Sequence, residues 1–261
     1  MASSLRTLTA AFGLFILGVS QTSFAHFQEM IPQTPVVTKS TGNTLNFDIL
    51  FTHPMEGGPV MDMGVPTAAG VMVNGEKENL LNSLIPTIYK RKESYSLQYK
   101  VKRPGTYQFY LQPAPYFEPA ENIYIRQNTK VVVDAYGAGE GWNQPVGLPS
   151  EIIPLTRPYA LWTGGSFTGV VIHNGKPQPG ATVEIEFRNT DKVAIPADAY
   201  LNQVVITNAN GEFTYSFPRA GWWGFAALIQ EKSTIKGTDG HKKEVLLEDD
   251  AVLWVHARDM K

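Results

Sequence analysis

Apolar and polar residues alternate along most of this chain, with the period of two that is typical of β-strands with one buried face. The alternation is clearest over residues 45–51, 95–101 and 183–187. Residues 131–133 are three consecutive valines, a run that suits a strand buried on both faces. Only residues 79–84 have a pattern that would allow one or two helical turns. We therefore predict an all-β protein.

Tight turns separate the predicted strands. Four dipeptides mark them: Asn74-Gly75, Pro104-Gly105, Asn174-Gly175 and Asn210-Gly211. Residues 103–109 (RPGTYQF) and 219–225 (RAGWWGF) form a weak internal repeat. The repeat predicts two β-sandwich domains, residues 26–136 and 165–258. The segment 137–164 between them is rich in Gly and Pro but also apolar, so we expect a packed inter-domain strap.

Residues 1–25 have the composition of a secretory signal peptide. Arg6 gives a positively charged start, residues 8–19 are apolar, and Ser23-Phe24-Ala25 is a small-x-small cleavage motif. The apolar stretch is shorter than the roughly 20 residues that a membrane helix needs, and no later segment approaches that length. We expect cleavage after Ala25, no membrane span in the mature chain, and a periplasmic location.

The composition narrows the chemistry that is open to the protein. The formal net charge is only −2, which argues against nucleic acid as a partner. There is no cysteine, so the fold has no disulfide, and any metal ligand must come from His, Met, Asp, Glu or backbone groups. The sequence has no Gly-x-Ser-x-Gly elbow and no phosphate loop, and no two acidic residues stand out as a catalytic pair. We therefore expect that the protein is not an enzyme.

His26 would be the first residue after signal cleavage. A terminal histidine offers its α-amino group and a ring nitrogen to one cation, and these groups titrate near ~8 and ~6.5. An internal histidine cannot form this two-nitrogen clamp. The alternative interpretation is that cleavage at this residue has no chemical meaning.

A second candidate cluster follows the first strong strand, in residues 53–63 (HPMEGGPVMDM). It contains His53, Glu56, Met61 and Met63, and imidazole, carboxylate and thioether groups together suit a soft or borderline transition metal. The alternative is a core histidine with methionines that fill gaps in the sandwich. If the early extended segment after residue 26 pairs antiparallel with residues 45–53, His26 falls beside His53.

Several long motifs of this chain resemble a known family. They are residues 25–28 (AHFQ), 51–59 (FTHPMEGGP), 129–134 (TKVVVD), 141–149 (GWNQPVGLP), 154–159 (PLTRPY) and 218–224 (PRAGWWG). They resemble the exported domain-of-unknown-function family DUF4198, which is associated with nickel and cobalt transport complexes. In addition, residues 165–230 resemble carboxypeptidase-regulatory-like sandwiches, which are related to the immunoglobulin-like type and in which the pattern is structural.

The resemblance implies a periplasmic accessory protein that captures or delivers a divalent metal, with a membrane metal-transport complex as its partner. It implies nickel or cobalt, and it supplies no ligand set. The residues themselves favour copper, because a given set of ligands binds copper more tightly than the other divalent first-row metals. We expect the metal to be held by His26, His53, Glu56, Met61 and Met63.

Two other functions fit the same residues. A terminal histidine with a second histidine on a β-sandwich is also the copper arrangement of oxidative polysaccharide-cleaving enzymes. A structural module that binds a glycan or a protein is the other alternative. Exposed aromatic side chains would then stack on sugar rings, and the candidates are Tyr110, Tyr116, Phe117, Trp142 and Trp162.

Overall fold

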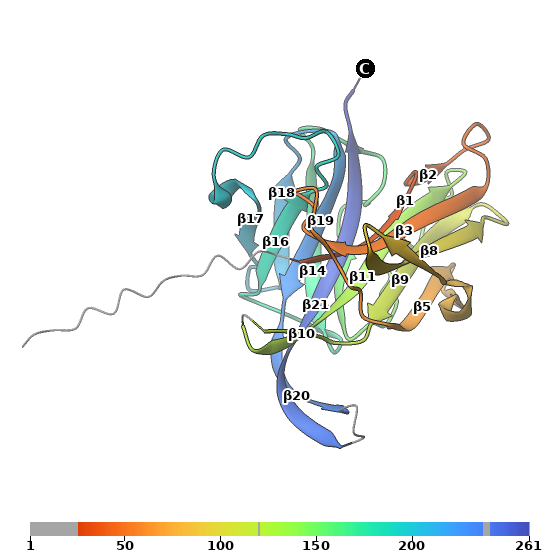
Figure 1. The fold of residues 1–261 in the computed structure, drawn as a ribbon. Coiled ribbons are helices and arrows are strands. Elements are labelled where there is room, and N and C mark those ends of the chain that lie inside the picture. Colours follow the sequence, from red (N-terminus) through yellow and green to blue (C-terminus); the bar gives the residue numbers. More distant parts are fainter. Residues whose placement is uncertain (1–25, 120, 237–240, 261) are drawn as a thin grey trace, which may run out of the picture.

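The computed structural model describes residues 26–119, 121–236 and 241–260, and the predicted signal peptide lies outside these residues. The prediction of an all-β protein is confirmed. In the described part of the chain the only helical elements are two single turns of 3₁₀-helix, Leu81–Ser83 and Asp198–Tyr200. The first of these lies within the segment for which helical turns were expected. The strands form three sheets (Figure 1).

The first sheet carries the N-terminal part of the chain. Its order is β1 (Phe27–Pro32), β3 (Thr44–Thr52), β8 (Lys92–Lys100) and β7 (Ile85–Tyr89), and β4 (Val60–Met61) also pairs with β3. Residues 45, 47, 49 and 51 of β3 are buried, as the alternation predicts. This sheet is the orange and yellow layer on one side of Figure 1.

The second sheet runs through the middle of the molecule. Its main path is β17 (Gln203–Ile206), β16 (Thr182–Phe187), β19 (Gly221–Leu228), β21 (Lys242–Arg258), β11 (Ile123–Ala135), β9 (Gly105–Pro113), β5 (Pro66–Val73) and β6 (Glu76–Asn79). Four more strands join it: β2 (Val36–Val37), β10 (Tyr116–Glu118), β13 (Leu161–Trp162) and β20 (Gln230–Lys236). β11 and β21 pair in parallel at its centre.

The third sheet covers the opposite face of the second. It consists of β12 (Ser150–Pro154), β14 (Ser166–His173), β15 (Lys176–Pro177) and β18 (Glu212–Ser216). β12 belongs to the segment predicted as an inter-domain strap. That segment also supplies β13, which pairs with the end of β21. The strap is therefore built into the sheets on both sides.

Two hydrophobic cores lie on opposite faces of the β11–β21 pair. Val131, Val133 and Trp254 belong to the core shared with the first sheet, whereas Val132 and Leu253 belong to the core shared with the third. Alternate residues of one strand thus enter different cores, which explains the continuous valine run. Because one sheet serves both cores, it crosses the boundary expected at residue 136. The division into two domains stays a prediction.

The internal repeat corresponds to two strands with the same start. β9 begins at Gly105 and β19 at Gly221, the glycine of each repeat. The hydroxyl of Tyr107 donates a 2.8 Å hydrogen bond to the carbonyl of Arg103. The indole N–H of Trp223 makes the equivalent 3.1 Å bond to the carbonyl of Arg219. In both copies an aromatic side chain therefore ties the strand to the turn that precedes it.

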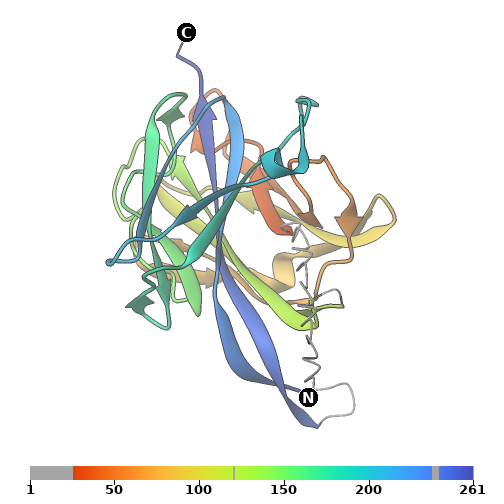
Figure 2. The same ribbon diagram turned by 90° about the vertical axis from the view of Figure 1, so that its left-hand side faces the viewer.

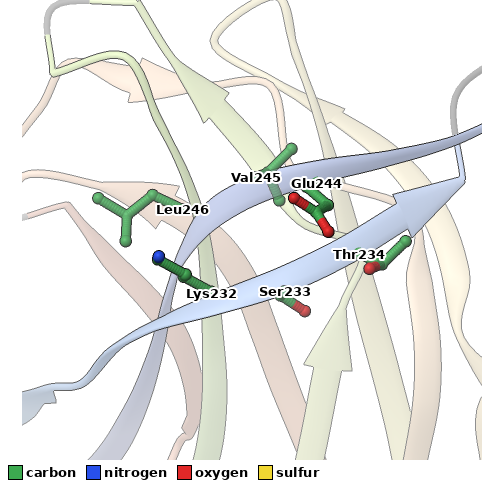
Figure 3. Close-up of a pocket in the computed structure, with 6 residues that line it drawn as sticks. All are labelled: Lys232, Ser233, Thr234, Glu244, Val245 and Leu246. Carbon is green, nitrogen blue, oxygen red and sulfur yellow. The ribbon is translucent and has the colours of Figure 1, made fainter.

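The hairpin of β20 and β21 extends beyond the rest of the molecule (Figures 1 and 2). A cavity of about 370 Å³ lies along it and is lined by residues 232–234 and 244–246. Figure 3 shows that these side chains come from the two hairpin strands. The cavity is thus a groove on a two-stranded ribbon, and neither His26 nor His53 lines it.

Candidate metal centre

The first two long strands bring His26 and His53 together. β1 and β3 pair antiparallel with Phe27 opposite Thr52, so the residues just beyond this pair are His26 and His53. The centroids of their imidazole rings are 4.5 Å apart, with an interplanar angle of 46°. The antiparallel pairing expected from the sequence is confirmed.

Side chains of β11 and β21 hold the start of β1 in place. Gln127 donates from its side-chain amide to the carbonyl of His26, and its amide oxygen accepts a 2.6 Å hydrogen bond from the N–H of Gln28. The indole of Trp254 donates a 2.9 Å bond to the carbonyl of Gln28. Backbone groups at the free edge of β1 thus form hydrogen bonds with side chains of the central sheet, which fixes the backbone next to His26.

A glycine allows this close approach between β1 and the central sheet. A Cβ atom added at Gly224 would lie 2.9 Å from the ring of Phe27 and 2.8 Å from the ring of Trp254. A residue with a Cβ would therefore force these rings to shift, and His26 is the residue directly before Phe27.

The surroundings keep the His26 ring neutral at physiological pH. Burial lowers its pKa to about 4, the neighbouring His53 lowers it as well, and Glu118 acts in the opposite direction. The ring of His26 stacks on Phe51, at 5.5 Å between centroids. Neutral imidazole is the form that binds metal, so this ring needs no deprotonation above a pH of about 4.

Two carboxylates flank the imidazole pair. Glu56, in the loop after β3, places Oε2 3.9 Å from Nδ1 of His53. Glu118, in β10, places Oε2 3.9 Å from Nε2 of His26 and accepts a 3.2 Å hydrogen bond from the hydroxyl of Tyr116. Glu56 was a predicted ligand, whereas Glu118 was not. β10 is a three-residue strand, too short for a periodicity that would have singled out Glu118.

The two methionines lie beside the Gln28–Phe51 pair, two register positions further from the strand ends than the histidines. Met61 pairs with Phe51 across β3 and β4, and in antiparallel strands such partners share a face. Met63 is buried, and its sulfur accepts a 3.4 Å hydrogen bond from the amide of Gln28. Gln28 and Phe51 are themselves partners, two register positions from the histidines and therefore on the same face of the sheet.

Among the described residues, no group of three or more His, Asp or Glu side chains has a geometry that would hold a metal ion. The side chains alone thus provide a pair of imidazoles with carboxylates about 4 Å away. A third nitrogen is available only if the chain begins at His26, because its α-amino group is then free.

β16 carries two buried carboxyl groups, Glu184 and Glu186, and the second of them contacts the loop after β3. Glu186 accepts a 3.1 Å hydrogen bond from the N–H of Met55, two residues after His53. Burial raises the pKa of Glu186 to about 8 and that of Glu184 to about 7, and nearby carboxylates add to both shifts. The bond from Met55 to Glu186 therefore supports the loop that carries Glu56.

These shifts predict that the free energy of unfolding falls as the pH rises from 6.5 to 8.5. A carboxyl group with a raised pKa in the folded state binds its proton more tightly when folded, and this stabilisation is lost as the pH passes the folded value. His26 and His256, whose pKa values are lowered to about 4, act in the opposite direction, but only below their ordinary value of 6.5. We expect a loss of about 2 kcal/mol in urea unfolding over this range.

The variant Glu186→Gln should remove most of this decrease in the free energy of unfolding with pH. Glu244→Gln, at an exposed position, should leave the pH dependence unchanged. If the free energy of unfolding of Glu186→Gln still falls by about 2 kcal/mol over this range, Glu186 is not the cause of the pH dependence.

The described part of the chain contains no helix with the length and apolar character of a membrane span. The sequence profile of the family "Domain of unknown function (DUF4198)" matches residues 23–231. None of the curated protein sequences matches this chain.

Several solved structures are similar to the chain at low identity. The D00-D0 domain of intimin is 11% identical, with 90% of this chain and 100% of that chain covered and a TM-score of 0.21. The two tandem V-type regions of VCBP3, a v-region-containing chitin binding protein, are 11% identical, with 86% and 98% covered and a TM-score of 0.24. BcpA, the major pilin subunit of Bacillus cereus, is 13% identical, with 90% and 68% covered and a TM-score of 0.19.

Proposed function

The chain belongs to the DUF4198 family, and we propose that it is a periplasmic accessory protein that captures or delivers nickel or cobalt for a membrane uptake system. The observation that carries the proposal is the 4.5 Å separation of the His26 and His53 rings at the predicted mature N-terminus. The metal is cargo rather than a resident cofactor.

The proposed coordination starts from three nitrogen donors. The α-amino group and Nδ1 of His26 can close a six-membered ring with one cation, and His53 supplies the third nitrogen. Nε2 of His26 is the nitrogen near Glu118, which leaves Nδ1 for the metal. A carboxylate beside the second ring nitrogen orients a ligating imidazole and raises its basicity.

Further donors come from the loop after β3. Glu56 is next to His53, and Met61 and Met63 lie beside the Gln28–Phe51 pair, two register positions further from the strand ends. These three remain proposed ligands for the positions that the nitrogens leave open. Nickel and cobalt accept such mixed nitrogen, oxygen and sulfur sites, and copper binds them more tightly. Selectivity for nickel or cobalt would therefore depend on geometry and on metal supply.

The variant His53→Ala tests the proposal. In protein processed at His26, it should weaken nickel binding more than tenfold, about 1.4 kcal/mol, in isothermal titration calorimetry. The matched variant His241→Ala removes an imidazole from an exposed position and should leave the affinity unchanged. Equal affinities of the His53 variant and the unaltered protein would remove His53 from the site.

Copper-loaded protein tests the alternative that the protein is an oxidative polysaccharide-cleaving enzyme. We expect that incubation with a polysaccharide and a reductant releases no oxidised sugar. Oxidised products that depend on His26 and His53 would make the protein an oxidative enzyme instead.

A further inference from the structure

A cavity of about 340 Å³ lies at the end of the molecule opposite the histidine pair. It is bounded by the chain after β1, by β13 and by the last residues of β21. β1 rises about 3.3 Å per residue from residue 27, which places the cavity roughly 20 Å from His26. It belongs to no part of the proposed metal site, and a volume of this size suits a single small ring.

One wall combines an exposed indole with a cation. Trp162 and Arg258 are direct partners in the parallel pairing of β13 and β21, so both side chains are on the same face of the sheet. Trp162 is 48% exposed, although its strand is built into the sheet. No ion pair of Arg258 is found among the residues that the structure describes. An aromatic face and a cation are therefore presented side by side to whatever enters the cavity.

His256 lies on the same face, two residues before Arg258. Its ring packs edge-on against Trp222 at 5.1 Å, and burial lowers its pKa to about 4, with Arg258 adding to the effect. The ring is thus uncharged near neutral pH, and Arg258 is the charged group of this wall.

The opposite wall is formed by small hydroxyl side chains in a turn. Thr38, Ser40 and Thr41 line the cavity, and Thr34 lies nearby on the same segment. Hydrogen bonds within the turn order them: the Thr38 and Ser40 hydroxyls are 2.8 Å apart, and Oγ1 of Thr41 accepts from the N–H of Thr38 at 2.8 Å. Each hydroxyl has capacity for further bonds, as donor or acceptor.

We propose that this cavity binds a sugar acid, a pyranose ring that carries a carboxylate. The apolar face of the ring stacks on the indole of Trp162, as sugars do on aromatic side chains that have one exposed face. The carboxylate pairs with the guanidinium of Arg258, a geometry that favours two parallel hydrogen bonds. The ring hydroxyls face Thr38, Ser40 and Thr41.

The test uses sodium D-glucuronate as the probe and the ¹⁵N-labelled indole signals of the five tryptophans. The signal that disappears in Trp162→Phe identifies Trp162. We expect this signal to shift with a dissociation constant near ~1 mM, as is common for one weakly held ring. D-glucose, which lacks the carboxylate, should bind at least about tenfold more weakly.

Two arginine variants separate the cavity from general charge effects. Arg258→Gln should weaken glucuronate binding about tenfold. Arg157→Gln removes the same charge from an exposed position outside the cavity and should leave binding unchanged. Equal losses in the two variants would overturn the proposal, as would an unshifted Trp162 signal at about 50 mM glucuronate, far above the expected constant.

Cyclohexanecarboxylate tests whether the hydroxyl wall takes part. It has the ring and the carboxylate but no hydroxyl groups, so it should bind more weakly than glucuronate. If it binds as tightly, the ligand class is an apolar carboxylate and the assignment to a sugar acid is wrong. None of these measurements depends on nickel binding, so failure here leaves the proposed metal function untouched.

Discussion

Replacing Glu151 by alanine should lower the free energy of unfolding by about 3–5 kcal/mol, the range for breaking a buried ion pair. Glu151 is 2% exposed and pairs with Lys130, which is 1% exposed, at 3.0 Å. It also accepts hydrogen bonds from the N–H groups of Val146, Gly147 and Leu148. The variant would leave a buried ammonium group and three backbone donors without their acceptor.

Urea unfolding of the processed chain measures this loss. Glu140→Ala, which removes an exposed carboxylate from the same segment, should change the free energy by less than about 0.5 kcal/mol. Glu151→Gln retains one acceptor oxygen and should fall between the two. A loss below about 1 kcal/mol for Glu151→Ala would mean that other contacts fasten residues 137–164.

The second large effect is expected at the N-terminus. One glutamine residue added ahead of His26 should weaken nickel binding at least about a hundredfold, or ~2.7 kcal/mol. The addition converts the α-amino group into a peptide nitrogen, which abolishes the six-membered chelate and leaves two separate imidazoles. A further residue is also forced into the space beside the two rings.

Calorimetry on exported protein gives the comparison, with mass spectrometry to establish the first residue of each sample. The thermal unfolding midpoints of the two metal-free proteins should agree, because residues 1–25 are absent from both and β1 begins only at Phe27. Equal nickel affinities would show that the terminal amine is not a ligand.

The sequence was sufficient to predict that His26 lies beside His53, because each step of that prediction depends on residues that are close together in the chain. The alternation of residues 45–51 determines which residues of β3 face the core. Pro54 cannot continue the ladder, so β3 ends at Thr52 and His53 follows directly. Because an antiparallel partner starts where its neighbour ends, His26 had to lie near this position.

Other parts of the site depend on contacts between distant segments. Gln127 meets His26 across 101 residues of sequence, and nothing around it distinguishes it from any polar residue of a strand. Glu118 belongs to a strand of three residues. The parallel pairing of β11 with β21 joins segments more than a hundred residues apart, and sequence periodicity carries no information on such partners.

The stacking of the three sheets also depends on contacts between distant segments, so the sequence pattern did not predict it. The three valines of β11 indicated a strand buried on both faces, and this was correct. The pattern did not reveal that each face belongs to a different core. Each copy of the repeat matches one strand and the turn before it, and both strands lie in the one sheet that serves both cores.

The most direct measurement of the proposed coordination is anomalous diffraction at the nickel edge from crystals of protein that begins at His26. We expect a single strong peak bonded to the terminal nitrogen, to a ring nitrogen of His26 and to the imidazole of His53. A nickel peak elsewhere on the molecule, or none at the paired imidazoles in nickel-saturated crystals, would contradict it.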